Sequence, residues 1–194
     1  MSRVRNRKRS GWLGFVMIIV LIAFLAAAGY YSYRKWIYAE HPLKYTEYVE
    51  SYSCEYGIDK YLVYAVIKTE SGYDSTAVSN VGARGLMQIM EDSFDWIKFK
   101  LDDDEAVYMD MFDPETNIRY GTYLLGFLYE EFGNVEATMA AYHAGRGKVN
   151  EWLLDPEISS DGKHLDTIPI PDTAHYVSKI KRAMSVYVDL YNKK

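Results

Sequence analysis

The sequence has few of the features that stabilise a small protein without a large core. It holds a single cysteine, Cys54, in 194 residues, so no intramolecular disulfide can form and the fold must depend on its hydrophobic core. The four histidines show no metal-ligand spacing, and the sequence contains neither a phosphate loop nor a nucleotide fingerprint. We therefore expect no metal and no cofactor.

Alternating strand patterns are also nearly absent, and apolar residues recur at helical spacing instead. Helix-start signals such as Asp113 before Pro114, and helix-ending glycines such as Gly133, support this interpretation. The predicted helices cover residues 42–56, 60–71, 113–132, 134–142 and 147–154, with a last helix capped by Asp172. Only the segment 160–163, which contains Asp161-Gly162, is typical of a turn in a small β-hairpin. We expect an all-α domain with at most this hairpin.

Acidic residues are missing from the first 35 residues, which hold seven of the 22 basic residues. The remainder carries 15 basic and all 27 acidic side chains, a formal charge of −12. An acidic domain does not attract nucleic acid, because that requires a basic face, so we expect no nucleic-acid partner. Its length of about 160 residues suits one domain rather than two.

The one long hydrophobic run begins at Trp12 and ends at Gly29. Its eighteen residues are at the short end for a membrane-spanning helix, and tyrosines follow it where a membrane interface is expected. A basic cluster precedes the run and places the N-terminus in the cytoplasm. The cluster consists of Arg3, Arg5, Arg7, Lys8 and Arg9.

These features predict a single-pass protein of the cell membrane. We expect a cytoplasmic basic tail at 1–11, a transmembrane signal anchor at 12–33, a short linker at 34–44 and an extracytoplasmic domain at 45–194. A cleaved secretory signal ending near Ala26-Ala27-Ala28 is one alternative, although the run is long for such a signal. A buried helix of a soluble domain is another, and the basic cluster argues against it.

An acidic residue, Glu70, lies where the helical pattern predicts an apolar one. It shares a helix face with Val63, Val66 and Ile67, at spacings of three and four. It also lies in the last turn before Gly72, where the helix dipole disfavours an anion. Burial and dipole both raise the pKa of a glutamate, as a general acid for cleaving a glycosidic bond requires. The alternative is that Glu70 turns into solvent as the helix ends.

The residues around Glu70 resemble a known family. Segment 70–74 reads Glu-Ser-Gly-Tyr-Asp and segment 82–90 reads Gly-Ala-Arg-Gly-Leu-Met-Gln-Ile-Met. With Ser79 between them, they resemble the catalytic signature of soluble-lytic-transglycosylase (SLT) domains, relatives of goose-type lysozyme. Three later blocks resemble the same family in the same order, so that the resemblance covers about residues 45–190 and implies a lysozyme-like fold. They are Asp113–Gly121, Ala140–Gly145 and Ile168–Val177.

The resemblance implies a peptidoglycan lytic transglycosylase with Glu70 as the catalytic residue. Glu70 protonates the oxygen between N-acetylmuramic acid (MurNAc) and N-acetylglucosamine (GlcNAc). The resulting carboxylate then takes a proton from the muramic C6 hydroxyl, which closes on C1 as a 1,6-anhydro sugar. The substrate thus supplies the nucleophile, and no second carboxylate is needed. The nearest one, Asp74, lies in a turn, where aspartate usually bonds its own backbone.

The same resemblance implies a set of substrate contacts on peptidoglycan glycan strands. Ser79 and Gln88 match sugar-binding positions, Met90 an apolar wall, and Tyr142 a phenol beside the acid. Tyr73 and His143 are further candidates: Tyr73 as a stacking platform and His143 at the edge of the cleft.

The sequence departs from the family pattern at His143, which stands where the family has asparagine. Ser75, Glu91 and Arg146 stand where proline is common, which affects loop stiffness more than chemistry.

Two alternative functions are a muramidase of the same fold that uses water and a non-catalytic wall-binding or assembly protein. The acid at position 70, together with Gln88 and Tyr142, argues against the second.

Overall fold

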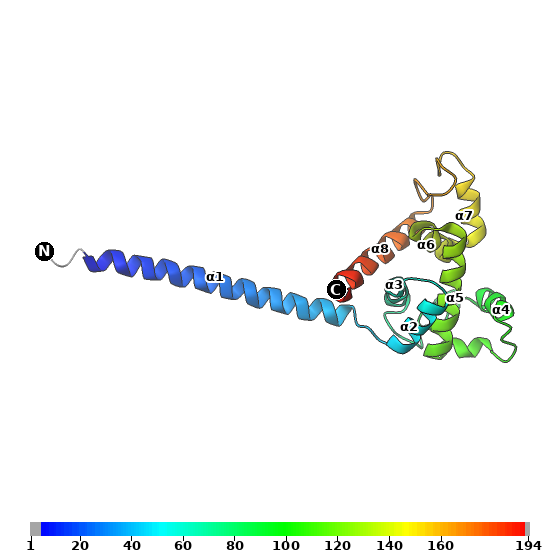
Figure 1. Cartoon of the computed structure of the whole chain (residues 1–194), viewed down its shortest axis with the longest axis horizontal. Helices are drawn as coiled ribbons and strands as arrows, with labels where there is room; N and C mark the ends of the chain where they lie inside the picture. Colours follow the sequence, from blue (N-terminus) through cyan, green and yellow to red (C-terminus); the bar gives the residue numbers. More distant parts are fainter. Residues whose placement is uncertain (1–4, 193–194) are drawn as a thin grey trace. The chain divides into compact units, whose positions relative to one another are not determined.

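The computed structural model describes residues 5–192, with side chains from Trp12 onward. In this range the chain is all-α, as predicted, with eight α-helices, one 3-10 helix and no strand (Figure 1). Residues 1–4 of the predicted basic tail and residues 193–194 of the predicted domain lie outside the described residues. The elements are α1 (Arg5–Glu40), α2 (Thr46–Glu55), α3 (Lys60–Glu70), α4 (Glu91–Lys100), η1 (Tyr108–Phe112), α5 (Pro114–Phe132), α6 (Val135–Ala144), α7 (Arg146–Leu153) and α8 (Pro171–Tyr191).

The strongest start and stop signals in the sequence act as predicted. The Asp59 carboxylate accepts the Tyr61 N–H at 2.7 Å and caps α3. Asp113 caps α5 in the same way, and this helix ends at Gly133, which is in the left-handed region with φ 69°. Asn134 caps α6. These side chains satisfy backbone N–H groups that have no partner inside a helix.

Other boundaries differ from the prediction. Helix α2 begins at Thr46 rather than at residue 42. Ile170 occupies the cap position of α8, because Pro171 begins the helix; Asp172 lies inside the first turn, where the helix dipole favours an anion. No hairpin forms at 160–163, since Asp161 accepts the backbone N–H groups of Lys163 and His164 in a local turn.

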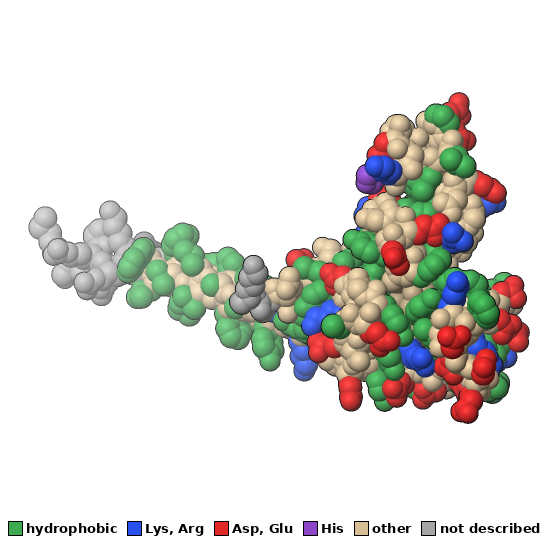
Figure 2. Space-filling view, turned by 45° about the vertical axis from the view of Figure 1, so that its right-hand side comes forward, with side chains coloured by type: hydrophobic (Ala, Val, Ile, Leu, Met, Phe, Trp, Pro, Cys, Tyr) green, Lys and Arg blue, Asp and Glu red, His purple; other side chains and the backbone are tan. Residues whose placement is uncertain are grey.

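The chain divides into two compact units, at residues 1–42 and 43–194. The first contains α1, whose segment Trp12–Glu40 is long and apolar enough to cross a membrane. An 18-residue stretch of this segment has a mean hydropathy of 2.6, and none of that stretch is buried. Figure 2 shows hydrophobic side chains along this helix. The helix continues through residues 34–40, which the sequence places in a linker.

The core of the second unit forms around α3. Six consecutive side chains of this helix, Leu62–Ile67, are at most 1% exposed. Helix α3 packs against α8 and α2, while the long helix α5 packs against α2, α4 and α6 (Figure 1). Burial on all sides of α3 fixes the position of its C-terminal residue, Glu70.

Candidate active site

Glu70 ends α3 half-buried, with one direct side-chain partner. The Tyr176 hydroxyl, on α8, donates to Glu70 Oε1 at 2.6 Å. Burial raises the pKa of Glu70, while the Tyr176 hydrogen bond and the charge of Lys179 lower it to a smaller extent. The net shift is upward. This is the direction that its place on the apolar face of the helix predicts, and it favours the protonated acid.

A loop at 79–90 lies against the end of α3 and is fixed from three sides. The Ser71 hydroxyl, just after α3, donates to the Leu86 carbonyl at 2.8 Å. Asn117 of α5 accepts the Met87 N–H at 2.8 Å, and the Tyr142 hydroxyl of α6 donates to the Met87 carbonyl at 2.7 Å. The backbone of Met87 is therefore held at both its N–H and its carbonyl by side chains from two different helices.

The loop approaches α5 so closely that two positions exclude a side chain. A Cβ atom on Gly85, which has φ 75°, would lie 2.0 Å from the Met111 carbonyl oxygen and 2.3 Å from Asn117 Nδ2. On α5, a Cβ atom on Gly121 would lie 2.4 Å from Met87 Sδ. Both glycines permit the close approach that brings the loop beside the acid.

The sequence predicts that one tyrosine, Tyr142, places its phenol beside Glu70, but in the structure two tyrosines lie near this acid. The hydroxyl of Tyr142 is donated to the Met87 carbonyl, so the phenol that donates to Glu70 is Tyr176. Burial and the charge of Glu70 raise the pKa of both tyrosines well above the usual value. Tyr142 therefore fixes the loop and lies within electrostatic reach of the acid, while Tyr176 bonds the acid directly.

The other predicted contact residues lie on the loop or at its edge. The Ser79 hydroxyl accepts the Ala83 N–H at 3.0 Å, and Gln88 Nε2 donates to the carbonyls of Ala77 and Gly85. These groups hold the loop itself. Met90 is 39% exposed at the start of α4. His143 is exposed at the end of α6, next to Tyr142.

Tyr73 does not have the position of a stacking platform. Its side chain is 6% exposed, and its hydroxyl lies 2.6 Å from the hydroxyl of Tyr187 on α8. Burial raises the pKa of Tyr73 far above the usual range. The backbone at Tyr73 is left-handed, with φ 73°, and the ring belongs to the hydrophobic core. The structure therefore corrects the prediction for this residue.

The sequence did not mark Tyr176 as a site residue, because it belongs to the apolar stripe of α8 together with Val177 and Ile180. The residue is 8% exposed. A buried phenol needs a hydrogen-bond partner, and this requirement was the available signal. Only the fold identifies that partner as Glu70.

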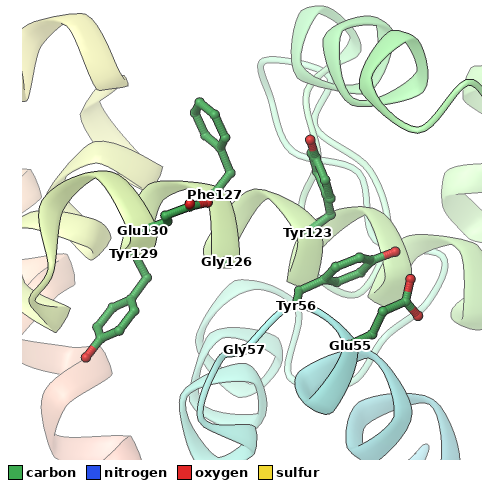
Figure 3. Close-up of a pocket in the computed structure, with 8 residues that line it drawn as sticks. All are labelled: Glu55, Tyr56, Gly57, Tyr123, Gly126, Phe127, Tyr129 and Glu130. Carbon is green, nitrogen blue, oxygen red and sulfur yellow. The ribbon is translucent and has the colours of Figure 1, made fainter.

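A pocket of about 510 Å³ lies between the end of α2 and one face of α5 (Figure 3). Its walls are aromatic, with the rings of Tyr56 and Tyr123 nearly perpendicular at 5.4 Å between centroids. None of the predicted site residues lines it. A smaller pocket of about 220 Å³ is lined by Tyr142, together with Trp96 and Arg146.

Among the described residues, no group of three or more His, Cys, Asp or Glu side chains has the arrangement of a metal site.

Fold and site together define an all-α protein in which a helix end presents a half-buried acid, and a glycine-containing loop is bonded to that helix end. The chain belongs to the transglycosylase SLT domain family, whose model matches residues 47–164. It is 33% identical over 142 residues to the soluble lytic murein transglycosylase of Escherichia coli K12, and the aligned region covers 72% of this chain and 22% of that protein. It is 36% identical over 116 residues to the membrane-bound lytic murein transglycosylase C of Sodalis glossinidius, and the aligned region covers 55% of this chain and 32% of that protein.

The fold of a solved relative is similar. The 70-kDa soluble lytic transglycosylase of Escherichia coli superimposes with a TM-score of 0.70 at 28% identity, covering 81% of this chain and 26% of that chain. The chain thus spans between about a fifth and a third of the length of these relatives.

Proposed function

We propose that this protein is a membrane-anchored peptidoglycan lytic transglycosylase. It cleaves the β-1,4 bond between MurNAc and GlcNAc and leaves a 1,6-anhydro-MurNAc end. The observation that carries the proposal is Glu70, an acid of raised pKa at the end of a buried helix, in a domain of the SLT family. The names of its curated relatives, lytic murein transglycosylases, support the same reaction and substrate.

Glu70 acts first as the acid and then as the base. Its raised pKa increases the fraction of protonated Glu70 that can donate to the glycosidic oxygen. After that transfer the carboxylate accepts the proton of the muramic C6 hydroxyl, and the C6 oxygen closes on C1. The Tyr176 hydroxyl donates to Glu70 Oε1 and stabilises the carboxylate between the two steps.

The surroundings of Glu70 favour a substrate nucleophile over water. Within the described residues, the side chains that shift the pKa of Glu70 are Tyr176 and Lys179, and neither is a carboxylate. A retaining glycosidase would need a second carboxyl group about 5–5.5 Å away, and an inverting one a carboxylate about 6.5–9.5 Å away to activate water. Asp74 is fully exposed and bonds the backbone and hydroxyl of Thr76. Its pKa is lowered by these bonds, so it serves the turn.

The loop provides the glycan contacts in this proposal. Met90 offers an exposed apolar wall, and Tyr142 holds the Met87 peptide beside the acid. Gln88 and Ser79 face the glycan with the polar atoms that the loop leaves unused. Gln88 Nε2 is committed to two carbonyls, which leaves its side-chain oxygen to accept a sugar hydroxyl.

The products of digestion test the reaction. We expect the full-length protein in mild detergent to release muropeptides from purified peptidoglycan that are lighter by one water than hydrolytic products. Mass spectrometry of the soluble fraction measures this difference. An Asp74→Asn variant is the matched control and should give the same products. Ordinary reducing muropeptides would instead identify a muramidase, and binding to the wall without any product would identify a non-catalytic protein.

In this proposal α1 contains an uncleaved membrane anchor, so the protein should stay in the membrane with its N-terminus intact. The apolar side chains of α1 are exposed, and 18 residues at 1.5 Å each span about 27 Å, close to the thickness of a bilayer's hydrocarbon core. We expect the protein to remain in bacterial membranes after alkaline carbonate extraction, and its intact mass to include residues 1–28. A mature N-terminus just after Ala28 would show that the segment is a cleaved signal.

A further inference from the structure

His143, the residue that departs from the family pattern, contacts Tyr176 rather than lying free at the edge of the cleft. Its ring centroid is 4.6 Å from that of Tyr176, with the two planes tilted by 31°. His143 Nδ1 lies 3.1 Å from the hydroxyl of Thr173, which is 1% exposed and stands one turn before Tyr176 on α8. The imidazole is therefore fixed against the phenol that donates to Glu70.

We propose that His143 is a positioning residue: it acts through Tyr176, holding the phenol against the Glu70 carboxyl, and does not act by touching the glycan. This inference rests on the proposed function. Tyr176 must keep its ring in one orientation to maintain the 2.6 Å bond to Glu70. The imidazole packs against one face of that ring and restricts its rotation, while the Thr173 contact restricts the imidazole.

The charge state of His143 adds a second effect. The groups around it are Asp172, Thr173 and Tyr176 on α8 and Tyr142 on its own helix, with Glu70 and Lys179 beyond Tyr176. Burial lowers the pKa of His143, and Asp172 opposes this shift to a smaller extent. The net shift favours the neutral imidazole. When protonated, the ring carries a positive charge next to the Tyr176–Glu70 pair, which lowers the pKa of Glu70 and so reduces the fraction of Glu70 that can donate a proton in the first step.

A double-mutant cycle on soluble glycan fragments tests the positioning role, with the full-length protein in detergent. We expect His143→Ala to lower kcat by about 3- to 10-fold, the value of one aromatic contact, with little change in KM. His143→Phe keeps a ring and should retain most of kcat. In a Tyr176→Phe background, which lacks the hydroxyl, His143→Ala should have no further effect. His164→Asn, at an exposed histidine paired with Asp161, is the matched control.

The pH profile separates the two effects of the imidazole. We expect the wild-type protein to lose kcat at low pH, and His143→Phe to lack this loss because it has no group to protonate. Unchanged kcat with raised KM in His143→Ala would overturn the proposal and make His143 a glycan contact. An undiminished effect in the Tyr176→Phe background would also overturn it.

A measurement that needs no catalysis keeps this inference separate from the proposed function. The Tyr176 hydrogen bond lowers the pKa of Glu70, so loosening Tyr176 should raise it. We expect carbon NMR of the Glu70 carboxyl to show a higher pKa in His143→Ala than in the wild-type protein. An identical titration would refute the positioning role. A wild-type protein that makes no anhydro product would refute the proposed function alone.

Discussion

A Glu70→Gln protein should release no anhydro-muropeptides from peptidoglycan, a loss of at least about a thousandfold in rate, since general acid–base catalysis contributes 10²–10⁴-fold and one group serves both steps. Glutamine keeps the size of the side chain and can still accept the Tyr176 hydroxyl bond, but it has no proton of suitable acidity. The measurement is the initial rate of product release by mass spectrometry. Retained cleavage by a folded variant would assign the acid to another residue.

The same substitution should make the protein more stable at neutral pH. The pKa of Glu70 is raised in the folded state, so below the unfolded pKa both states are protonated and the residue has no cost. As pH rises from the unfolded pKa through the folded pKa, ionisation of Glu70 favours the unfolded chain, and the free energy of unfolding falls. Glutamine avoids this ionisation. We expect a gain of about 0.5–2 kcal/mol in urea unfolding at pH 7, which disappears near pH 4. A loss of stability at pH 7 would contradict the burial argument.

Replacement of Asn117 by alanine should destabilise the protein by about 3–5 kcal/mol, although Asn117 has no role in the reaction. Its side chain accepts the Met87 N–H and donates to the carbonyls of Arg84 and Met111, at 2.8, 3.0 and 2.8 Å. Asn117 is completely buried, so the variant removes all three bonds and leaves the Met87 N–H and the Met111 carbonyl without this partner, each costing about 1–3 kcal/mol. The Arg84 carbonyl still accepts the Ile89 N–H. Chemical unfolding of the full-length protein measures the loss.

Two further variants show whether hydrogen bonding or volume is responsible. Asn117→Asp keeps the volume and the acceptor for Met87, but it places an acceptor opposite two carbonyls and should also be destabilised at neutral pH. Asn80→Ala, in an exposed turn of the same loop, should unfold like the wild-type protein. An Asn117→Asp protein of full stability would show that only the volume matters.

The position of the acid could be predicted from the sequence, because the pattern along one helix contains the relevant information. Glu70 follows Val63, Val66 and Ile67 on a buried face, and this face alone indicates a raised pKa. The caps at Asp59 and Asp113 were predictable for the same reason, since a cap bonds backbone groups only two or three residues away.

The partners of the acid and of the loop could not be predicted, because they come from distant parts of the chain. Tyr176 lies 106 residues from Glu70, and Asn117 lies 30 residues from Met87. Tyr176 follows the spacing of an ordinary core residue. Tyr73 lies in a segment whose sequence suits a binding role, but its hydroxyl pairs with Tyr187, 114 residues away, inside the core. Helix α4 was missed because Phe94 and Ile97 are its only fully buried side chains.

The length of α1 has a practical consequence for anyone who shortens this chain. Its 36 residues extend for about 54 Å, and the 18 apolar residues account for only half of that length. A truncated protein that begins at Tyr30 would lose the apolar run but keep a helical stub rich in exposed aromatic rings, including Tyr31, Tyr33 and Trp36. Such a stub is prone to self-association in water. A soluble form should therefore begin at Leu43, where the second unit starts.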